Sequence, residues 1–351
     1  MRRWAAVMLG AALLCGCASG PAPEAVSPGL VSERPGAAPA EEFFTIESVE
    51  TWTFGGALGR QINTRNYRLF TTEKDAVIVD RAPRFLELAL DHYRSALGPL
   101  PAPPLKLDTF LMDNRTQWSR LTLQMLGEQG RRYQAIGRGG FATGGRAFLY
   151  DIGLFDTLAI AAHEGWHQYT QRTFRDPLPV WLEEGIAAYM EGHRWAGPEP
   201  VFLPWANLER FDQLRSAKAR GAVMTLPMLL DSSPQDMLGV VGDGALTYYA
   251  QVWALIHFLN EGADGRYRET LRALLVQASQ GQMRQTLANQ LGAPSAARAL
   301  TARRGPEVFQ AYFGEDLTQV SREYEAFMSR LVIAGSRGPI AEGRSPFEAA
   351  R

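Results

Sequence analysis

The sequence predicts an α+β fold in which a small mixed or antiparallel sheet precedes a mainly helical part. Alternating and aromatic residues that suit short strands come first, over residues 43–72. From Leu154 onward, apolar residues recur mostly at helical spacing. Strands followed by helices are typical of α+β proteins, in which the two kinds of element are segregated. We therefore expect a sheet-containing lobe over residues 43–153 and a helical lobe over residues 154–335, with a cleft between them.

Local patterns predict the elements of the first lobe. Apolar residues at helical spacing predict a helix over residues 84–97, which ends before Gly98 and a proline-rich turn. Residues 105–112 predict a buried strand, and a polar helix start follows near Asn114.

Residues 137–145 form a glycine-rich run that lacks the Gly-Lys-Ser/Thr ending of a phosphate-binding loop. This composition favours a hairpin or a loop at the rim of the sheet. The next residues, 146–150, predict a short strand. Two roles stay open for it: an edge strand that pairs with an extended peptide, or a plain structural strand.

The second lobe contains the longest stretches of helical periodicity. The predicted helices cover residues 154–173, 180–192, 245–260, 266–278, 283–291 and 316–331. Residues 336–351 are expected to form a flexible tail.

The N-terminus predicts a lipoprotein signal peptide over residues 1–16. A short basic start is followed by the apolar run Trp4–Leu14, which is too short to span a bilayer as a mature helix. The residues Leu14-Cys15-Gly16-Cys17 resemble the bacterial lipobox, in which the cysteine is lipidated and becomes the new N-terminus. An ordinary secretory signal is the alternative interpretation. The order of charge, apolar core and cleavage box favours lipidation at Cys17.

Residues 17–42 are rich in Pro, Ala, Gly, Ser and Glu, which predicts a flexible tether between a lipid anchor and the folded part. We expect the protein in the cell envelope, anchored in the outer membrane and facing the periplasm, because Ala18 gives no inner-membrane retention signal. Cleavage before Cys17 leaves no other cysteine, so any metal site has to be built from His, Asp and Glu. The formal net charge is −1 and the positive residues are scattered, so nucleic-acid binding is not expected.

The segment His163-Glu164-Gly165-Trp166-His167 contains the residues that we expect to bind a metal ion and to act in catalysis. Its two histidines are four residues apart, so on a helix they lie one turn apart on the same face. Glu164 lies about 100° round that helix, where it can reach a water molecule on a shared metal ion without being a ligand. This is the His-Glu-x-x-His arrangement, in which both histidines bind zinc and the glutamate is the general base. The alternative is a buried histidine pair satisfied by hydrogen bonds.

A third ligand is expected, and its type determines the class of zinc site. Thr170 and Thr173 stand where the metzincin pattern needs glycine and histidine, so that class is excluded. The helix predicted over 180–192 carries Glu183 and Glu184 in an otherwise apolar stretch. A buried, unpaired charge costs several kcal/mol, so we expect one of these carboxylates to meet a cation. Two histidines and one glutamate with an open fourth position form a catalytic zinc site.

The run Trp181-Leu182-Glu183-Glu184-Gly185-Ile186-Ala187, placed after His-Glu-x-x-His, resembles the gluzincins. The resemblance is to aminopeptidase-N-like enzymes and, above all, to the bacterial peptidase MA-like proteins. It implies a zincin-type helical lobe with the active-site cleft beside the sheet. In that pattern the glutamate directly before the glycine binds zinc, which selects Glu184 as the third ligand. The Gly-x-Met-Glu-Asn exopeptidase motif is absent, so aminopeptidase activity does not carry over.

Together the motif and the resemblance predict a metallopeptidase with one Zn²⁺ ion held by His163, His167 and Glu184. Metal-activated water would be the nucleophile and Glu164 the general base. A donor to the developing oxyanion is also needed, and the resemblance favours Tyr249 over Tyr248. The alternative is that both tyrosines are core aromatics.

Other functions stay open. One is a non-catalytic zinc-binding lipoprotein that acts as a binding or scaffold module, against which the intact Glu164 argues. Another is a zinc hydrolase of a different amide, such as cell-wall peptide. The expected partners are a peptide or protein substrate and the membrane, reached through the N-terminal lipid.

Replacement of Cys17 by alanine is expected to abolish membrane anchoring, because the lipid-bearing sulfur is lost. The measurement is the distribution of exported protein between membrane and soluble fractions. Cys15→Ala is the matched control and keeps the membrane fraction. Exported Cys17→Ala that stays anchored would contradict the lipoprotein prediction.

Overall fold

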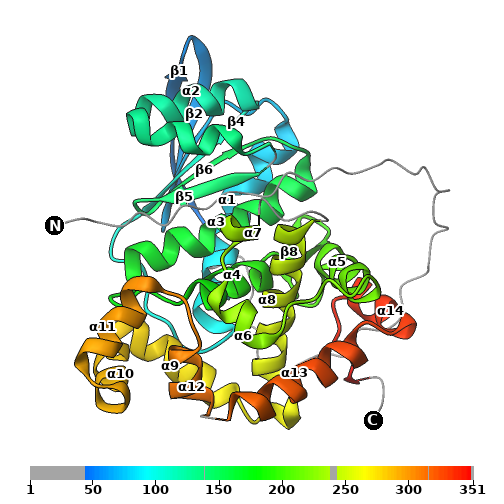
Figure 1. The fold of residues 1–351 in the computed structure, drawn as a ribbon. Helices are drawn as coiled ribbons and strands as arrows, with labels where there is room; N and C mark the ends of the chain where they lie inside the picture. The colour runs from blue at the N-terminus through cyan, green and yellow to red at the C-terminus, as the bar shows by residue number, and fades with distance from the viewer. Residues whose placement is uncertain (1–43, 138, 238–242, 315, 349–351) are drawn as a thin grey trace.

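A six-stranded mixed sheet forms the N-terminal part of the computed structural model, which describes residues 44–137, 139–237, 243–314 and 316–348. The strand order is β1-β2-β3-β4-β6-β5 (Figure 1). The strands are β1 (Ile46–Phe54), β2 (Ala57–Thr64), β3 (Tyr67–Thr71), β4 (Leu107–Met112), β5 (Gly140–Thr143) and β6 (Arg146–Tyr150). Strand β4 pairs in parallel with β3 and β6, and the other neighbours pair antiparallel. The predicted α+β class, with a mixed sheet first and helices afterwards, is confirmed.

Helical crossovers join the parallel strands, as parallel pairing requires. Helix α1 (Ala76–Ser95) connects β3 to β4, and α2 (Arg115–Leu126) with the 3₁₀ helix η2 (Gly127–Ala135) follows β4. Helix α1 begins before the predicted residue 84, because the Asp75 carboxylate caps it by accepting from the backbone N–H groups of Val77 and Ile78. Asn114 caps α2 in the same way, where the sequence predicted a helix start.

Strand β4 is buried on both faces of the sheet, as predicted for this segment. Leu107 and Leu111 belong to the large core cluster on the side of α1 and the helical lobe. Phe110 and Met112 point the other way, into a smaller cluster that includes Trp118 of α2. Helices therefore cover both faces of the centre of the sheet.

Strand β6 lies between β4 and β5, so the prediction that residues 146–150 could be an edge strand is wrong. The strand at this edge is β5, which arises from the glycine-rich run. The hairpin interpretation of residues 137–145 is confirmed: Gly144 and Gly145 have φ of 58° and 71° and join β5 to β6. Strand β5 is only four residues long and gives no strand signal in the sequence.

The rest of the chain is mainly helical. Its elements are α3 (Leu154–Thr173), α4 (Val180–Met190), β7 (His193–Ala196), β8 (Glu199–Phe202), α5 (Leu208–Ala219), α6 (Leu226–Asp231), α7 (Pro234–Met237), α8 (Gly244–Glu261), η3 (Ala263–Gly265), α9 (Arg268–Gln280), α10 (Met283–Leu291), α11 (Ala293–Ala302), α12 (Glu307–Phe313), α13 (Leu317–Leu331), η4 (Ala334–Ser336) and α14 (Arg337–Ala341). Each helix predicted after residue 153 is present, with ends close to those predicted. None of the helices in the described ranges is long and apolar enough to cross a membrane.

The two lobes share one hydrophobic core. The large cluster combines Leu69 of the sheet and Tyr93 of α1 with Trp166 of α3 and Trp253 of α8. The change from strands to helices after residue 153 is therefore not a boundary between separate cores. The predicted signal peptide, tether and Cys17 lie outside the described residues.

The C-terminal segment is packed against the helical lobe, so the prediction of a flexible tail does not hold for residues 336–348. Ile340 is fully buried, and Ser345 Oγ donates to Glu261 Oε2 at 2.7 Å. The ring of Phe347 lies 4.8 Å from that of Phe327 and under the guanidinium of Arg330. Two isolated apolar residues in a polar segment gave no periodicity from which this packing could be predicted.

Gly185 lets α4 approach α8 closely, directly beside Glu184. A Cβ at this position would lie 2.8 Å from both Ile256 Cγ1 and the carbonyl oxygen of Val252. Glycine within a helix is otherwise unfavourable. Close helix packing therefore explains its presence in α4.

Gly185→Ala is expected to lower the free energy of unfolding by about 1–3 kcal/mol, because the added methyl group overpacks the α4–α8 contact. Urea unfolding followed by circular dichroism measures this. Gly335→Ala is the matched control, since a Cβ there meets no atom within 4 Å. Equal stability of the two variants would contradict the packing argument.

Candidate metal centre

Three predicted side chains from two consecutive helices meet at one buried point. His163 and His167 come from α3 and Glu184 from α4. Glu184 Oε2 lies 3.5 Å from His163 Nε2 and 3.6 Å from His167 Nε2. One potential ligand atom from each residue lies within 4.8 Å of the other two, so the cluster could hold a metal ion. This confirms that the residues selected from the sequence come together.

Carboxylates behind the two histidines fix how the imidazole rings are protonated. His163 Nδ1 lies 2.8 Å from Glu191 Oε1, and His167 Nδ1 lies 3.0 Å from Glu183 Oε1. Because an ionised carboxylate only accepts hydrogen bonds, each Nδ1 carries the proton and donates it. Both Nε2 atoms are then free to act as metal ligands, in the pattern usual for metal-binding histidines.

The resulting cluster fits a cation. Two Nε2 lone pairs and a carboxylate oxygen face one another, and such acceptors repel without a positive charge between them. His167 Nε2 and Glu184 Oε2 are buried and have no hydrogen-bond partner among the described residues. Buried polar atoms in proteins are nearly always paired, so these unpaired atoms point to a bound ion. Two histidines and one glutamate are a donor set for catalytic zinc.

The pKa directions agree with a site that attracts positive charge. Burial lowers the pKa of His167, but the nearby carboxylates of Glu183 and Glu184 outweigh it and raise the value to about 10. Burial raises the pKa of Glu184, whereas the nearby imidazoles of His163 and His167 outweigh it and lower the value to about 2. In the absence of metal, protonated imidazoles balance the negative charges of the nearby carboxylates.

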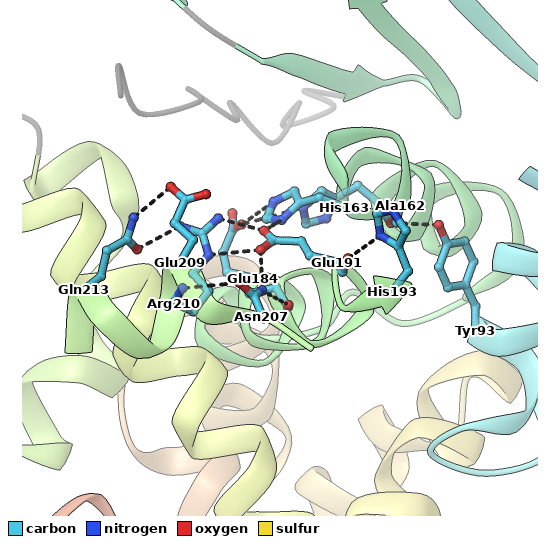
Figure 2. Close-up of polar contacts among 12 residues, drawn as sticks. Tyr93, Ala162, His163, Glu184, Glu191, His193, Asn207, Glu209, Arg210 and Gln213 are labelled. Atoms are coloured by element: carbon cyan, nitrogen blue, oxygen red, sulfur yellow. Dashed lines mark hydrogen bonds and ion pairs between the residues drawn. The ribbon is translucent and has the colours of Figure 1, made fainter. Parts of the chain in front are cut away.

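Glu191 is held in place by a network that the sequence did not predict. Its Oε1 accepts from Arg210 Nη2 at 2.7 Å, and its Oε2 accepts from Asn207 Nδ2, also at 2.7 Å (Figure 2). Arg210 lies on α5, and Asn207 immediately precedes that helix. Glu191 lies seven residues after Glu184, two turns along and on the same face, which is the one sequence signal for its role. Nothing in the sequence linked Arg210 and Asn207 to His163.

Glu183 orients His167 and is not a member of the cluster. Its Oε1 also accepts from Thr170 Oγ1 at 2.6 Å, and its Oε2 lies 3.7 Å from Arg303 Nη2. The spacing alone did not decide which of the two adjacent carboxylates is the third ligand. The structure distinguishes them, because Glu184 faces Nε2 atoms, whereas Glu183 faces an Nδ1 atom.

Glu164 lies beside the cluster but outside it. Its side chain is buried, and Oε2 has no hydrogen-bond partner among the described residues. Burial raises the pKa of this carboxyl group, whereas the charges of His163 and His167 and, to a smaller extent, a hydrogen bond from the backbone of Ala142 on β5 oppose the shift. A Cβ at Gly140 would lie 3.5 Å from Glu164 Cγ, so β5 passes directly over this side chain.

Tyr249 lies at the cluster, whereas Tyr248 is a core residue. The ring centroid of Tyr249 is 5.9 Å from that of His163, and the Arg210 guanidinium lies 5.1 Å from the same tyrosine ring. Burial and the negative charge of Glu184 raise the pKa of both tyrosines. Tyr248 is fully buried, and its hydroxyl has no hydrogen-bond partner among the described residues.

A cavity of about 1100 Å³ opens beside the cluster, next to His167 and Glu184. Its walls come from α3, α4, the loop between them, the α6–α7 region and α11 with the residues that follow it. All of these belong to the helical lobe. The sequence predicted a cleft between the two lobes, whereas this cavity lies within the helical one.

The family model described as "Protein of unknown function (DUF1570)" matches residues 157–281. The matched stretch contains His163, Glu164, His167, Glu184 and Tyr249. No curated protein matches the chain.

Glu184→Ala is expected to lose stoichiometric metal, because it removes one of three ligands. Glu183→Ala is expected to keep the metal with roughly 10- to 100-fold lower affinity, the usual effect of removing a hydrogen-bond partner of a ligand. Metal content after dialysis and competition with a chelator measure both. The reverse result, with metal lost only from Glu183→Ala, would show that the ligand is misassigned.

Proposed function

We propose that this protein is a zinc-dependent metallopeptidase of the gluzincin type that hydrolyses peptide bonds. One observation carries the proposal: a buried His163–His167–Glu184 cluster with oriented Nε2 atoms lies next to a second buried carboxylate, Glu164. A site that only stored a metal ion would not need this additional carboxylate.

The proposed ion is one Zn²⁺, held by two imidazole nitrogens and one carboxylate oxygen. Zinc bound there supplies Lewis acidity that polarises a carbonyl group and lowers the pKa of water. With three protein ligands, a tetrahedral ion keeps one position open for water or substrate. This open position distinguishes a catalytic from a structural site.

Glu164 is the proposed general base and, later, general acid. A buried carboxylate oxygen without a hydrogen-bond partner costs free energy, which is unexpected unless the group has a task. A carboxylate beside the metal-bound water is a suitable acceptor for its proton. It takes a proton from water and delivers it to the leaving amine.

Strand β5 is the proposed docking edge for an extended peptide. Within the described residues it pairs with β6 on one side only. A peptide added as a further strand would gain backbone hydrogen bonds largely independent of its side chains. Because Gly140 and Ala142 of this strand lie beside Glu164, the peptide backbone would be placed near the base.

Tyr249 is the proposed donor to the oxyanion that develops in the reaction. Its position against His163 supports this role better than that of Tyr248, which is enclosed in the core. A hydroxyl aimed at developing charge stabilises the transition state more than the ground state.

Two alternatives remain as proposals of lower rank: a non-catalytic zinc-binding module, and a zinc hydrolase of another amide such as cell-wall peptide. The Glu164 oxygen that has no hydrogen-bond partner among the described residues disfavours the first. The second shares all the chemistry of the site and differs only in substrate. The proposed location is the cell envelope, with the chain anchored through a lipid on Cys17.

Glu164→Gln is expected to keep one zinc per chain and to lower peptide cleavage by about 10²- to 10⁴-fold, because the base is lost while the ligands stay. Cleavage of a mixed peptide library by the wild-type and variant proteins, with metal content measured in parallel, tests this. As a control, chelation followed by added zinc restores cleavage by the wild type only. Equal cleavage by both zinc-loaded proteins would exclude Glu164 as the base.

A further inference from the structure

The cavity beside the cluster is rich in arginine. Arg175 follows α3, Arg298 lies on α11, and Arg303 and Arg304 follow α11. Since His167 and Glu184 line the same cavity, whatever occupies it lies next to the metal site. Its volume of about 1100 Å³ exceeds that of one side chain, so it has room for a stretch of peptide.

The carboxylates of the cavity wall already have partners. Glu184 belongs to the cluster, and Glu183 accepts from His167 and Thr170. Asp176 Oδ2 accepts from the backbone N–H of Arg284 at 3.0 Å. These carboxylates therefore already pair with other groups of the protein or belong to the cluster.

Two of the arginines are likewise engaged. Arg303 Nε donates to the carbonyl oxygen of Leu178 at 2.7 Å, and its backbone carbonyl accepts from Val180 N–H at 2.8 Å. Both contacts hold the start of α4. Arg304 pairs with Asp236 Oδ2 at 2.9 Å. Neither residue is a suitable choice for a substitution that should leave the fold intact.

Arg175 and Arg298 have no carboxylate partner within the described part of the chain. Arg298 donates to the hydroxyl of Ser295 at 2.9 Å, and both side chains belong to exposed residues on the cavity wall. A guanidinium group is a planar donor that matches a carboxylate in geometry and charge. The cavity thus offers two guanidinium groups that the protein itself does not neutralise.

We propose that this cavity is a substrate subsite that recognises a carboxylate group through Arg175 and Arg298. The carboxylate belongs to an acidic side chain near the cleaved bond or to the free C-terminus of the peptide. This inference rests on the proposed peptidase function and adds the substrate class: acidic peptides are preferred over neutral ones of the same length and shape.

The test uses matched peptides that differ only in Glu or Gln at each position around the cleaved bond, each with a free or an amidated C-terminus. The zinc-loaded full chain is expected to cleave a carboxylate-bearing peptide with a kcat/KM roughly 10- to 100-fold above that of its neutral counterpart, the effect of a hydrogen bond to a charged group. The position at which the preference appears distinguishes a side chain from a C-terminal carboxylate.

Arg175→Gln combined with Arg298→Gln is expected to abolish this preference, so that kcat/KM for the carboxylate-bearing peptide falls to that of its neutral counterpart. Arg322→Gln is the matched control, because this exposed arginine of α13 does not line the cavity, and it keeps the preference. The same peptides, fluorescently labelled, are also titrated into zinc-loaded Glu164→Gln with and without the double substitution, which measures binding independently of cleavage.

The outcomes separate the two proposals. Cleavage without any preference for a carboxylate, or a preference that survives the double substitution, overturns the subsite and leaves the peptidase standing. If the wild type cleaves no peptide but binds the acidic one more tightly through these arginines, the subsite stands and the peptidase function falls. Equal binding of acidic and neutral peptides, with no cleavage, overturns both.

Discussion

The site depends on two hydrogen bonds between imidazole and carboxylate groups. By accepting from Nδ1 of His163 and His167, Glu191 and Glu183 turn both Nε2 lone pairs toward Glu184. Without them, either ring could rotate or carry its proton on Nε2, and the cluster would bind a cation more weakly. With them, three acceptors face one another, and the free energy of that arrangement is favourable only with positive charge between them.

The fold holds these groups from several directions. Helix α3 is tied to the sheet by Gln168, whose amide nitrogen donates to the carbonyl oxygen of Asp108 on β4 at 2.7 Å. Helix α4 is held against α8 through the close contact at Gly185. Arg210 pairs with Glu191 behind one histidine, and Arg303 lies near Glu183 behind the other. Contacts with the sheet, with α8 and with two arginines therefore position the groups of the cluster.

Periodicity and motif spacing predicted the fold class, the main helices and the cluster residues, because these signals are local in the sequence. The resemblance to gluzincins selected Glu184 over Glu183, and the approach of the two carboxylates to different nitrogens of His167 agrees with it. Contacts between distant segments left no such signal. The pairing of Arg210 with Glu191 and the packing of Phe347 join segments whose proximity only the folded chain creates. Strand β5 was not predicted from the sequence, because its four residues form a strand through their pairing with β6 and not through their composition.

Anomalous diffraction at the zinc absorption edge, from crystals of the protein grown with zinc, tests the central claim most directly. The account predicts a single peak at the cluster, about 2.0–2.2 Å from His163 Nε2, His167 Nε2 and a carboxylate oxygen of Glu184. It also predicts that Glu191 and Glu183 remain hydrogen-bonded to the Nδ1 atoms. Crystals with excess zinc and no peak between these three side chains, or with Glu183 in place of Glu184 on the ion, would contradict it.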